Sequence, residues 1–199
     1  MQTDRLELVR LRKEHAPGML AVWSDPMTTL WSNYGVCSTL EEAEERMSLL
    51  LPDEAPTGDN FAILIRRDLD QETINSFKPT TEPNDVFTPG GFVGWIGTWR
   101  TEPIAEVGFT LHRSTWGMGF ATEAVMGFSS LFWHLKPEID SLNAFCDVEN
   151  AASNRVLSKC GFELVGIEYG ECELPWMVPS MRDTVQYRLA KGVGLGVSM

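Results

Sequence analysis

The sequence predicts a single α/β (α+β) domain in which one mixed, mostly antiparallel, twisted sheet carries helices on both faces. A chain of 199 residues is long enough to bury an ordinary core without disulfide or metal support. Strand-like alternation and helix-like periodicity follow one another in the order β-α-α-β-β-β-α-β-α-β-β. No internal repeat or domain boundary interrupts this order. We therefore expect one domain over residues 1–190 and a frayed, glycine-rich tail over 191–199.

The first half of the chain is expected to alternate between short strands and short helices. Residues 5–12 alternate polar and apolar side chains, with a one-residue slip that suggests a bulge near Leu8. A helix is predicted over 16–23, with a proline tolerated in its first turn. A capping box that begins at Ser38 opens an acidic second helix. The apolar run 61–65 predicts a short buried strand.

Residues 68–90 differ in character from the rest of the chain. They are rich in Asp, Glu, Thr, Asn and Pro and show no sustained period. We expect a long surface insertion with little regular structure.

The second half of the chain is expected to be more regular. Alternating or apolar runs predict five strands, over residues 91–99, 104–112, 141–148, 162–169 and 184–190. A strongly apolar helix is predicted over 122–135, and another over 150–159 with Gly161 as its C-terminal cap. The proline-bearing stretch 171–181 is expected to be a long loop between the last two strands.

The composition argues against several classes of partner. A formal net charge of −12 opposes binding to nucleic acid or to an anionic membrane, because phosphate binding needs clustered Lys and Arg. The same charge is compatible with a cationic amine or basic peptide as substrate. No apolar run approaches the roughly 18–20 residues that cross a bilayer, and the N-terminus has no apolar signal-peptide core. We therefore expect a cytoplasmic protein.

The cysteines do not indicate a metal site. Cys37, Cys146, Cys160 and Cys172 form no CxxC pair and have no histidine at metal-ligand spacing. Free thiols in a reducing compartment, and no bound metal, are the expectation.

The strongest local signal is a turn with two glycines between a predicted strand and a predicted helix. Gly117 and Gly119 can adopt backbone angles closed to other residues, so that successive amides point into one concavity. The helix that follows adds its free N–H groups and the positive end of its dipole. Such a turn can bind a diphosphate without a lysine. A tight turn without a ligand is the alternative.

A second segment, residues 147–162 (DVENAASNRVLSKCGF), makes the signal specific. With residues 116–124 (WGMGFATEA), it resembles the paired motifs of the GNAT acyltransferase superfamily, especially the RimJ/RimL-like branch that acetylates ribosomal-protein N-termini. The opening TDRL at residues 3–6 and the closing RDT at 182–184 also resemble that branch. The likeness covers the chain except residues 68–90 and the final tail.

The resemblance implies a GNAT-like sheet and an N-acetyltransferase that uses acetyl-CoA as co-substrate. The acetyl group would pass directly to a primary amine, on a protein N-terminus or a small molecule. A catalytically inactive acyl-CoA-binding or sensing module of the same fold is the alternative. A Rossmann-type nucleotide domain is disfavoured because Thr122 replaces the third glycine of its fingerprint, and a P-loop because its lysine is absent. Both a monomer and a homodimer remain open.

The same resemblance implies a set of residues that bind the cofactor. They are Val107, Phe109, Arg113, Trp116, Gly117, Met118, Gly119, Phe120, Ala121, Thr122, Asn150, Ser153 and Arg155. The superfamily often has Gln or Arg three residues before the first glycine. Here that position is Ser114, so a phosphate contact would be lost or would move to Arg113.

Two residues are candidates for proton transfer. Glu106 precedes the glycine turn on its strand and is the candidate general base, acting through a water. Its alternative is a solvent-facing charge, and Glu102 is a weaker competitor. Backbone N–H groups of the same strand could stabilise the carbonyl oxygen. Many GNAT enzymes use a tyrosine as the general acid that protonates the departing thiolate, but this chain has Leu157 at that position. The RimL-like arrangement implies that Ser153 is the acid instead.

Aromatic side chains are candidates for the acceptor pocket. They are Trp23, Trp31, Tyr34 and Trp176. Each could equally pack in the core or at its rim.

Overall fold

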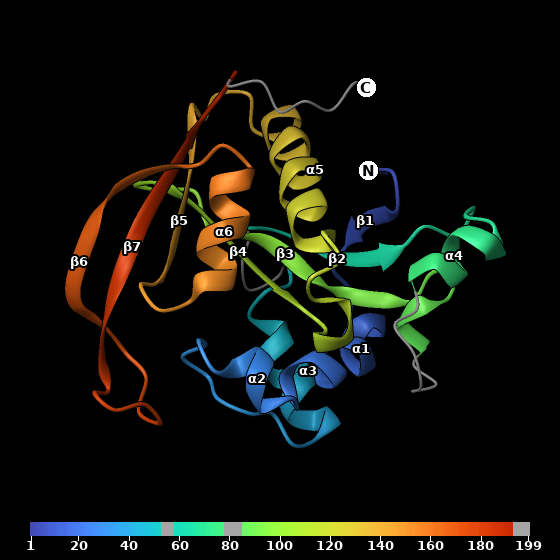
Figure 1. Ribbon diagram of the computed structural model, residues 1–199, viewed down its shortest axis with the longest axis horizontal. Helices are drawn as coiled ribbons and strands as arrows, with labels where there is room; N and C mark the ends of the chain where they lie inside the picture. Colours follow the sequence, from blue (N-terminus) through green and yellow to red (C-terminus); the bar gives the residue numbers. More distant parts are fainter. Residues whose placement is uncertain (53–57, 78–84, 193–199) are drawn as a thin grey trace.

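The computed structural model describes residues 1–52, 58–77 and 85–192. They form one seven-stranded sheet in the order β1-β2-β3-β4-β5-β7-β6 (Figure 1). The strands are β1 (Leu6–Arg10), β2 (Asp59–Ile65), β3 (Phe92–Arg100), β4 (Ala105–Leu111), β5 (Ser141–Asp147), β6 (Glu163–Glu173) and β7 (Met181–Ala190). Only β4 and β5 are parallel, so the predicted mixed, mostly antiparallel sheet is confirmed.

Helices cover both faces of the sheet, as predicted. Those of the described residues are α1 (Ala16–Trp23), α2 (Pro26–Thr29), α3 (Leu40–Ser48), α4 (Gln71–Phe77), α5 (Phe120–Leu135) and α6 (Ala151–Lys159). Figure 1 shows α5 and α6 on one side of the sheet and α1, α2 and α3 on the other.

Strand β2 shows why the sheet needs both layers. Its side chains are buried along the whole strand, and they alternate between two cores. Phe61, Ile63 and Ile65 join the core that contains the phenylalanines of α5. Ala62 and Leu64 join the core formed with α1 and α3. A strand buried on both faces appears in the sequence as a continuous apolar run, which is what residues 61–65 show.

The sheet opens between β4 and β5. The two strands pair only at Ala105 with Leu142 and at Glu106 with Asn143. Beyond this point β4 stays paired with β3, and β5 stays paired with β7. The two facing edges therefore part, and their backbone N–H and C=O groups face each other across a gap instead of forming a ladder.

Two local predictions in the first half are wrong. The β1–β2 register runs from Leu6 to Arg10 without a shift, so β1 has no bulge near Leu8. Helix α3 is capped by Thr39, whose side chain accepts a hydrogen bond from the Glu42 N–H, and not by Ser38. Ser38 instead donates its own N–H to the Glu42 carboxylate, so the capping pattern is displaced by one residue.

The segment 68–90 contains more structure than expected. Residues 78–84 lie outside the described range, but α4 precedes them and a short 3-10 helix, Asp85–Phe87, follows. Ile74, Phe77, Val86 and Phe87 are all buried. These apolar residues are spaced too irregularly for the sequence to predict their burial.

The stretch predicted as a loop over 171–181 is shorter than expected. Strand β6 continues to Glu173 and β7 begins at Met181, so the prolines occupy only the tip of this hairpin.

Candidate functional site

A cavity of about 530 Å³ occupies the opening between β4 and β5. It extends from the first turn of α5 to the first turn of α6, and on the other side it reaches α2 and the segment after it. It is lined by Met27, Thr28, Leu30, Trp31, Ser32, Val107, Gly108, Phe109, Thr110, Leu111, Thr115, Trp116, Gly117, Gly119, Phe120, Ala121, Thr122, Ala144, Phe145, Cys146, Asp147, Asn150, Ala152, Ser153, Arg155, Val156, Leu157 and Lys159.

The glycine turn forms one end of this cavity. Gly117 and Gly119 have φ angles of 76° and 81°, in the left-handed region that favours glycine. Gly119 is the N-cap of α5 and offers no side chain to the helix. The first intrahelical bond runs from the Glu123 N–H to the Gly119 carbonyl. The preceding amides, at residues 120–122, therefore have no intrahelical acceptor and are available to an anion.

The N-terminal segment holds the turn from behind. Arg5 donates from Nε to the Glu123 carboxylate at 2.7 Å and from Nη1 to the Met118 carbonyl at 2.9 Å. Thr3 donates its hydroxyl to the same carboxylate at 2.6 Å. These contacts give a physical reason for TDRL and WGMGFATEA to occur in one chain, because the two motifs bind each other.

The first turn of α6 forms the facing wall. The Asn150 side chain caps the helix by accepting from the Ser153 N–H at 3.1 Å. Asn154 ties this turn to the sheet, since its side chain donates to the Asp147 and Asn150 carbonyls and accepts from the Tyr187 hydroxyl at 2.9 Å. Ser153 is thus held, half-buried, at the cavity wall.

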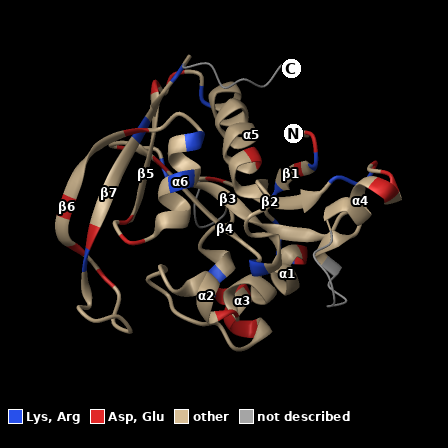
Figure 2. Cartoon of the chain, in the orientation of Figure 1, with Lys and Arg blue, Asp and Glu red and all other residues tan. Residues whose placement is uncertain are grey.

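Basic side chains on α6 add positive charge beside the cavity. Arg155 and Lys159 both line it, and Figure 2 shows that α6 carries only basic charges whereas β6 carries only acidic ones. The protein as a whole is negatively charged and would repel an anion, so these two side chains supply local positive charge at the cavity.

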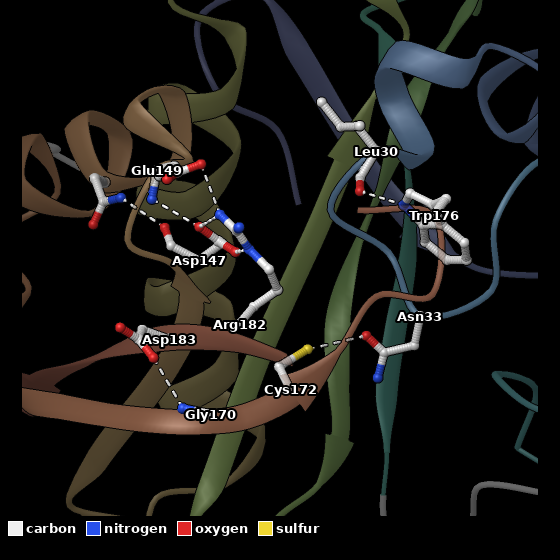
Figure 3. Close-up of polar contacts among 10 residues, drawn as sticks. Leu30, Asn33, Asp147, Glu149, Gly170, Cys172, Trp176, Arg182 and Asp183 are labelled. Atoms are coloured by element: carbon white, nitrogen blue, oxygen red, sulfur yellow. Dashed lines mark hydrogen bonds and ion pairs between the residues drawn. The ribbon is translucent and has the colours of Figure 1, made fainter. Parts of the chain in front are cut away.

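A buried ion-pair network braces the end of β5 (Figure 3). Arg182 binds Asp147 through Nε at 2.7 Å and Nη2 at 3.2 Å, and it binds Glu149 through Nη2 at 2.7 Å. The Arg182 side chain is 6% exposed and that of Asp147 is 4% exposed, whereas Glu149 is 66% exposed. The hydrogen bond to Asp147, and to a smaller extent the one to Glu149, raises the pKa of Arg182 above its usual range. Its guanidinium also lies over the ring of Trp31, 5.9 Å from the centroid.

The β6–β7 hairpin holds the segment after α2 in place (Figure 3). The Trp176 indole donates to the Leu30 carbonyl at 2.9 Å, and the Cys172 thiol donates to the Asn33 side chain at 3.6 Å. The wall that contains Leu30 therefore depends on a hairpin more than a hundred residues away in the sequence.

Most of the residues predicted for the cofactor line this one cavity. They are Val107, Phe109, Trp116, Gly117, Gly119, Phe120, Ala121, Thr122, Asn150, Ser153 and Arg155. Arg113 and Met118 do not line it. The Arg113 side chain is exposed and lies 3.8 Å from Asp25, and Met118 packs against the core while its carbonyl binds Arg5.

The candidate base Glu106 lies next to the cavity but is not part of its lining. Its carboxylate is buried and accepts from Arg100 Nη2 at 2.6 Å and from Arg100 Nε at 3.1 Å. Strand alternation places it on the same face of β4 as Gly108 and Thr110, and residues of both faces of β4 from Val107 onward line the cavity. Glu102, the competitor, is exposed on the turn before β4.

Of the four aromatic candidates for the acceptor pocket, Trp31 alone lines the described cavity. Trp23 is buried in the α1–α3 core. Tyr34 is largely exposed and stacks against Arg46, and Trp176 supports the wall through its bond to Leu30.

Cys146 lines the cavity, yet it is poorly suited to act as a nucleophile. Burial, with the Asp147 charge beside it, raises the pKa of this thiol to about 12. Burial also raises the pKa of Cys160 to about 12. All four cysteines are free, and no cluster of metal-ligating side chains occurs in residues 1–52, 58–77 and 85–192.

Sequence reasoning missed the residues that hold the site together. Asp147 and Asn154 lie inside the second motif, and Arg5 and Arg182 lie in the opening and closing motifs. The motifs were a usable signal for these positions. The pairing of Arg182 with Asp147 could not be predicted, because nothing in the sequence links these two residues, which are 35 positions apart.

The helices that the structure describes include none long and apolar enough to cross a membrane.

Comparison with known proteins agrees with this geometry. The chain is 26% identical over 174 residues to the uncharacterized N-acetyltransferase p20 of Bacillus licheniformis, covering 84% of each chain. Its fold is similar to that of a Salmonella typhimurium acetyltransferase that modifies the N-terminal serine of ribosomal protein L7/L12, with a TM-score of 0.71, 18% identity and 94% and 96% coverage. It is also similar to the microcin C7 self-immunity acetyltransferase MccE in complex with acetyl-CoA and AMP, with a TM-score of 0.70, 14% identity and 94% and 93% coverage.

The family model described as the acetyltransferase (GNAT) domain matches residues 5–163, which is most of the chain. The predicted resemblance is confirmed: this chain belongs to the GNAT family and is an acetyl-CoA-dependent acetyltransferase.

Proposed function

We propose that this enzyme transfers the acetyl group of acetyl-CoA directly to a primary amine, on a protein N-terminus or a small molecule. The observation that carries the proposal is the single cavity that joins the free amides of the α5 turn, the open edge of β4 and the first turn of α6. Acetyl-CoA supplies a thioester whose carbonyl carbon the amine attacks.

The first turn of α5 would hold the diphosphate. Its unpaired N–H groups and the helix dipole favour an anion, and a Cβ built on Gly117 would meet no atom within 4 Å, so the backbone is open to close approach. Arg155 and Lys159 add charge on the facing helix. These features fit coenzyme A without the lysine of a P-loop.

The open edge of β4 would align the thioester. Alternate residues of β4 direct their N–H and C=O groups toward β5, and β5 no longer pairs with them beyond Glu106. Amide groups around Val107 to Phe109 can therefore donate to the thioester oxygen as negative charge develops on it.

Two side chains would move the protons. Glu106 would take the proton from the amine through a bridging water, because it is a buried carboxylate one residue before Val107, the first residue of β4 that lines the cavity, and is not itself in the lining. Ser153 would donate a proton to the sulfur as the carbon–sulfur bond breaks. Glu106 then releases its proton to water and Ser153 regains one from water, so that amine and thioester become amide and thiol. The Ser153 hydroxyl makes no hydrogen bond to the residues described, so it is free to turn toward the cavity.

The acceptor would enter from the α2 side, where Leu30, Trp31 and Met27 form an apolar wall. The Asp147–Arg182–Glu149 network beside it carries one more negative than positive charge. An amine, which is a cation in water, suits such a surface. One similar structure is an enzyme that modifies a protein N-terminal serine, and another is a self-immunity acetyltransferase in complex with acetyl-CoA and AMP, so the amine is assigned here only by class.

A panel of amines tests the proposal directly. The protein is incubated with acetyl-CoA and either amino-terminal peptides or small amines, and both free CoA and the acetylated product are measured. We expect stoichiometric release of CoA and formation of an amide with at least one primary amine. Release of CoA without any acetylated amine contradicts the proposal.

The glycine turn gives the first mutational prediction. Gly117→Trp should weaken CoA binding more than tenfold, because the indole fills the space that the diphosphate needs, while the positive φ costs only about 1–2 kcal/mol of folding stability. Calorimetric titration with CoA measures the affinity. The matched control is Gly170→Trp, at another open glycine with φ of 65°, which should bind CoA normally. Equal affinity in both variants would remove the turn from the site.

Glu106→Gln should lower kcat by about a hundredfold at neutral pH, the usual contribution of a general base. The KM for acetyl-CoA should not change, since the carboxylate does not line the cavity. Initial rates with the best amine of the panel provide the measurement. Glu102→Gln is the control and should behave as the parent enzyme; full activity in Glu106→Gln means that another group is the base.

Ser153→Ala should lower kcat about tenfold or more and leave the affinity for CoA within twofold. The reason is that the hydroxyl acts on the leaving sulfur, whereas the Asn150 cap accepts from the Ser153 backbone and survives the change. Ser158→Ala, on the same helix with its hydroxyl bonded to the Asn154 carbonyl, is the control. An unchanged kcat argues against Ser153 as the acid.

If the acetyl group passes directly to the amine, Cys146 should not act as a nucleophile and should react slowly with alkylating agents. With its pKa raised to about 12, only a small fraction is thiolate between pH 7 and 9, and that fraction rises about tenfold per pH unit. Alkylation of Cys146 by iodoacetamide, followed by mass spectrometry, should be slow and show this slope. Cys146→Ala should keep kcat within about threefold. Rapid alkylation at pH 7, or an acetylated Cys146 during turnover, would indicate an acyl-enzyme instead.

A further inference from the structure

We propose that Arg5 is a positioning residue for the diphosphate of coenzyme A, although it lies 113 residues before the turn that it touches. The inference rests on the proposed binding of coenzyme A at the α5 turn. It assigns to the N-terminal segment before β1 a part in cofactor binding.

The argument begins with one peptide group. Arg5 Nη1 donates to the Met118 carbonyl at 2.9 Å. In a planar trans peptide the C=O and the following N–H point in opposite directions. A fixed Met118 carbonyl therefore fixes the Gly119 N–H, which must point away from Arg5 and toward the cavity side of the turn.

The guanidinium is itself held rigidly. Its Nε binds Glu123 Oε2 at 2.7 Å, and the Arg5 backbone N–H binds Glu123 Oε1 at 2.7 Å. The central carbon of the guanidinium lies over the ring of the fully buried Phe120, 4.3 Å from the centroid. Arg5 thus joins Met118, the residue before Gly119, to the first turn of α5. These are the two sides of the cradle, by which we mean the glycine turn and the free amides of residues 120–122.

Geometry, and not charge, is the dominant effect. The Arg5–Glu123 pair is neutral as a unit, so its net attraction for a diphosphate is small. Glycine at position 119 has a wide choice of backbone angles, and without a fixed carbonyl its amide would lose its direction. Holding this amide in advance lowers the entropy lost on binding.

Arg5→Lys separates the two effects, because lysine keeps the charge but cannot reach Glu123 and the Met118 carbonyl with one planar fork. We expect the Kd for CoA, measured by calorimetry, to rise about tenfold. The Kd for 3′-phosphoadenosine 5′-diphosphate, which keeps the diphosphate and omits the pantetheine arm, should rise by the same factor.

Glu123→Gln provides a second, independent test. If Arg5 acts through geometry, loss of its anchor weakens CoA binding; if it acts through charge, the uncompensated guanidinium strengthens binding. We expect weaker binding, by about three- to tenfold. Stronger binding overturns the proposal.

Arg10→Lys is the matched control. Arg10 is the last residue of β1, five positions after Arg5. It pairs with Asp59 and lies over the Phe61 ring, 4.6 Å from its centroid, and no hydrogen bond or ion pair among the described residues joins it to the turn. It should lose a similar amount of thermal stability and keep the parent Kd for CoA. Equal loss of affinity in Arg10→Lys and Arg5→Lys, an unchanged Kd in Arg5→Lys, or a loss confined to whole CoA each overturns the positioning role. Failure of the unmodified protein to bind CoA would refute the proposed function instead.

Discussion

The parting of β4 and β5 is the constraint on which the rest of this structure depends. The two strands share only two paired positions, because each is held along its other edge, β4 by β3 and β5 by β7. The opening leaves backbone donors without a strand partner, and the first turns of α5 and α6 meet at the same place. Such groups are costly when buried and unpaired, so the arrangement favours a polar occupant. The cavity follows from topology before any side chain is considered.

Main-chain donors also reconcile an acidic protein with an anionic co-substrate. With a formal charge of −12, the protein has more carboxylates than cationic side chains. A phosphate site built only from Lys and Arg would therefore be weakened by the surrounding negative charge. Amide groups at a helix start carry no proton equilibrium and keep their direction at any pH. Their weakness is that glycines confer freedom as well as access. The contacts of Thr3 and Arg5 with Glu123 limit that freedom from the side opposite the cavity.

The parts of the fold that were predictable from sequence are those with local causes. The order of strands and helices follows from periodicity, and the glycine turn follows from the conformations that Gly117 and Gly119 allow. Residues with a distant cause were not predictable. Nothing local marks Ile74 and Phe77 as buried, because their partners lie on other elements, and nothing local pairs Arg182 with Asp147. The same limit applies to the site: the glycine turn is visible in its own residues, whereas the place of Arg113, outside the cavity lining and 3.8 Å from Asp25, involves a residue far away in the sequence.

The wall after α2 is maintained by the β6–β7 hairpin, through the bonds from Trp176 to Leu30 and from Cys172 to Asn33. The glycine turn takes its support from the opposite end of the chain, through Arg5. The two ends of one cavity thus have separate scaffolds. During evolution, mutations in the hairpin can therefore reshape the acceptor end of the cavity without disturbing the glycine turn. Related enzymes could in this way change their acceptor and keep the same acyl donor.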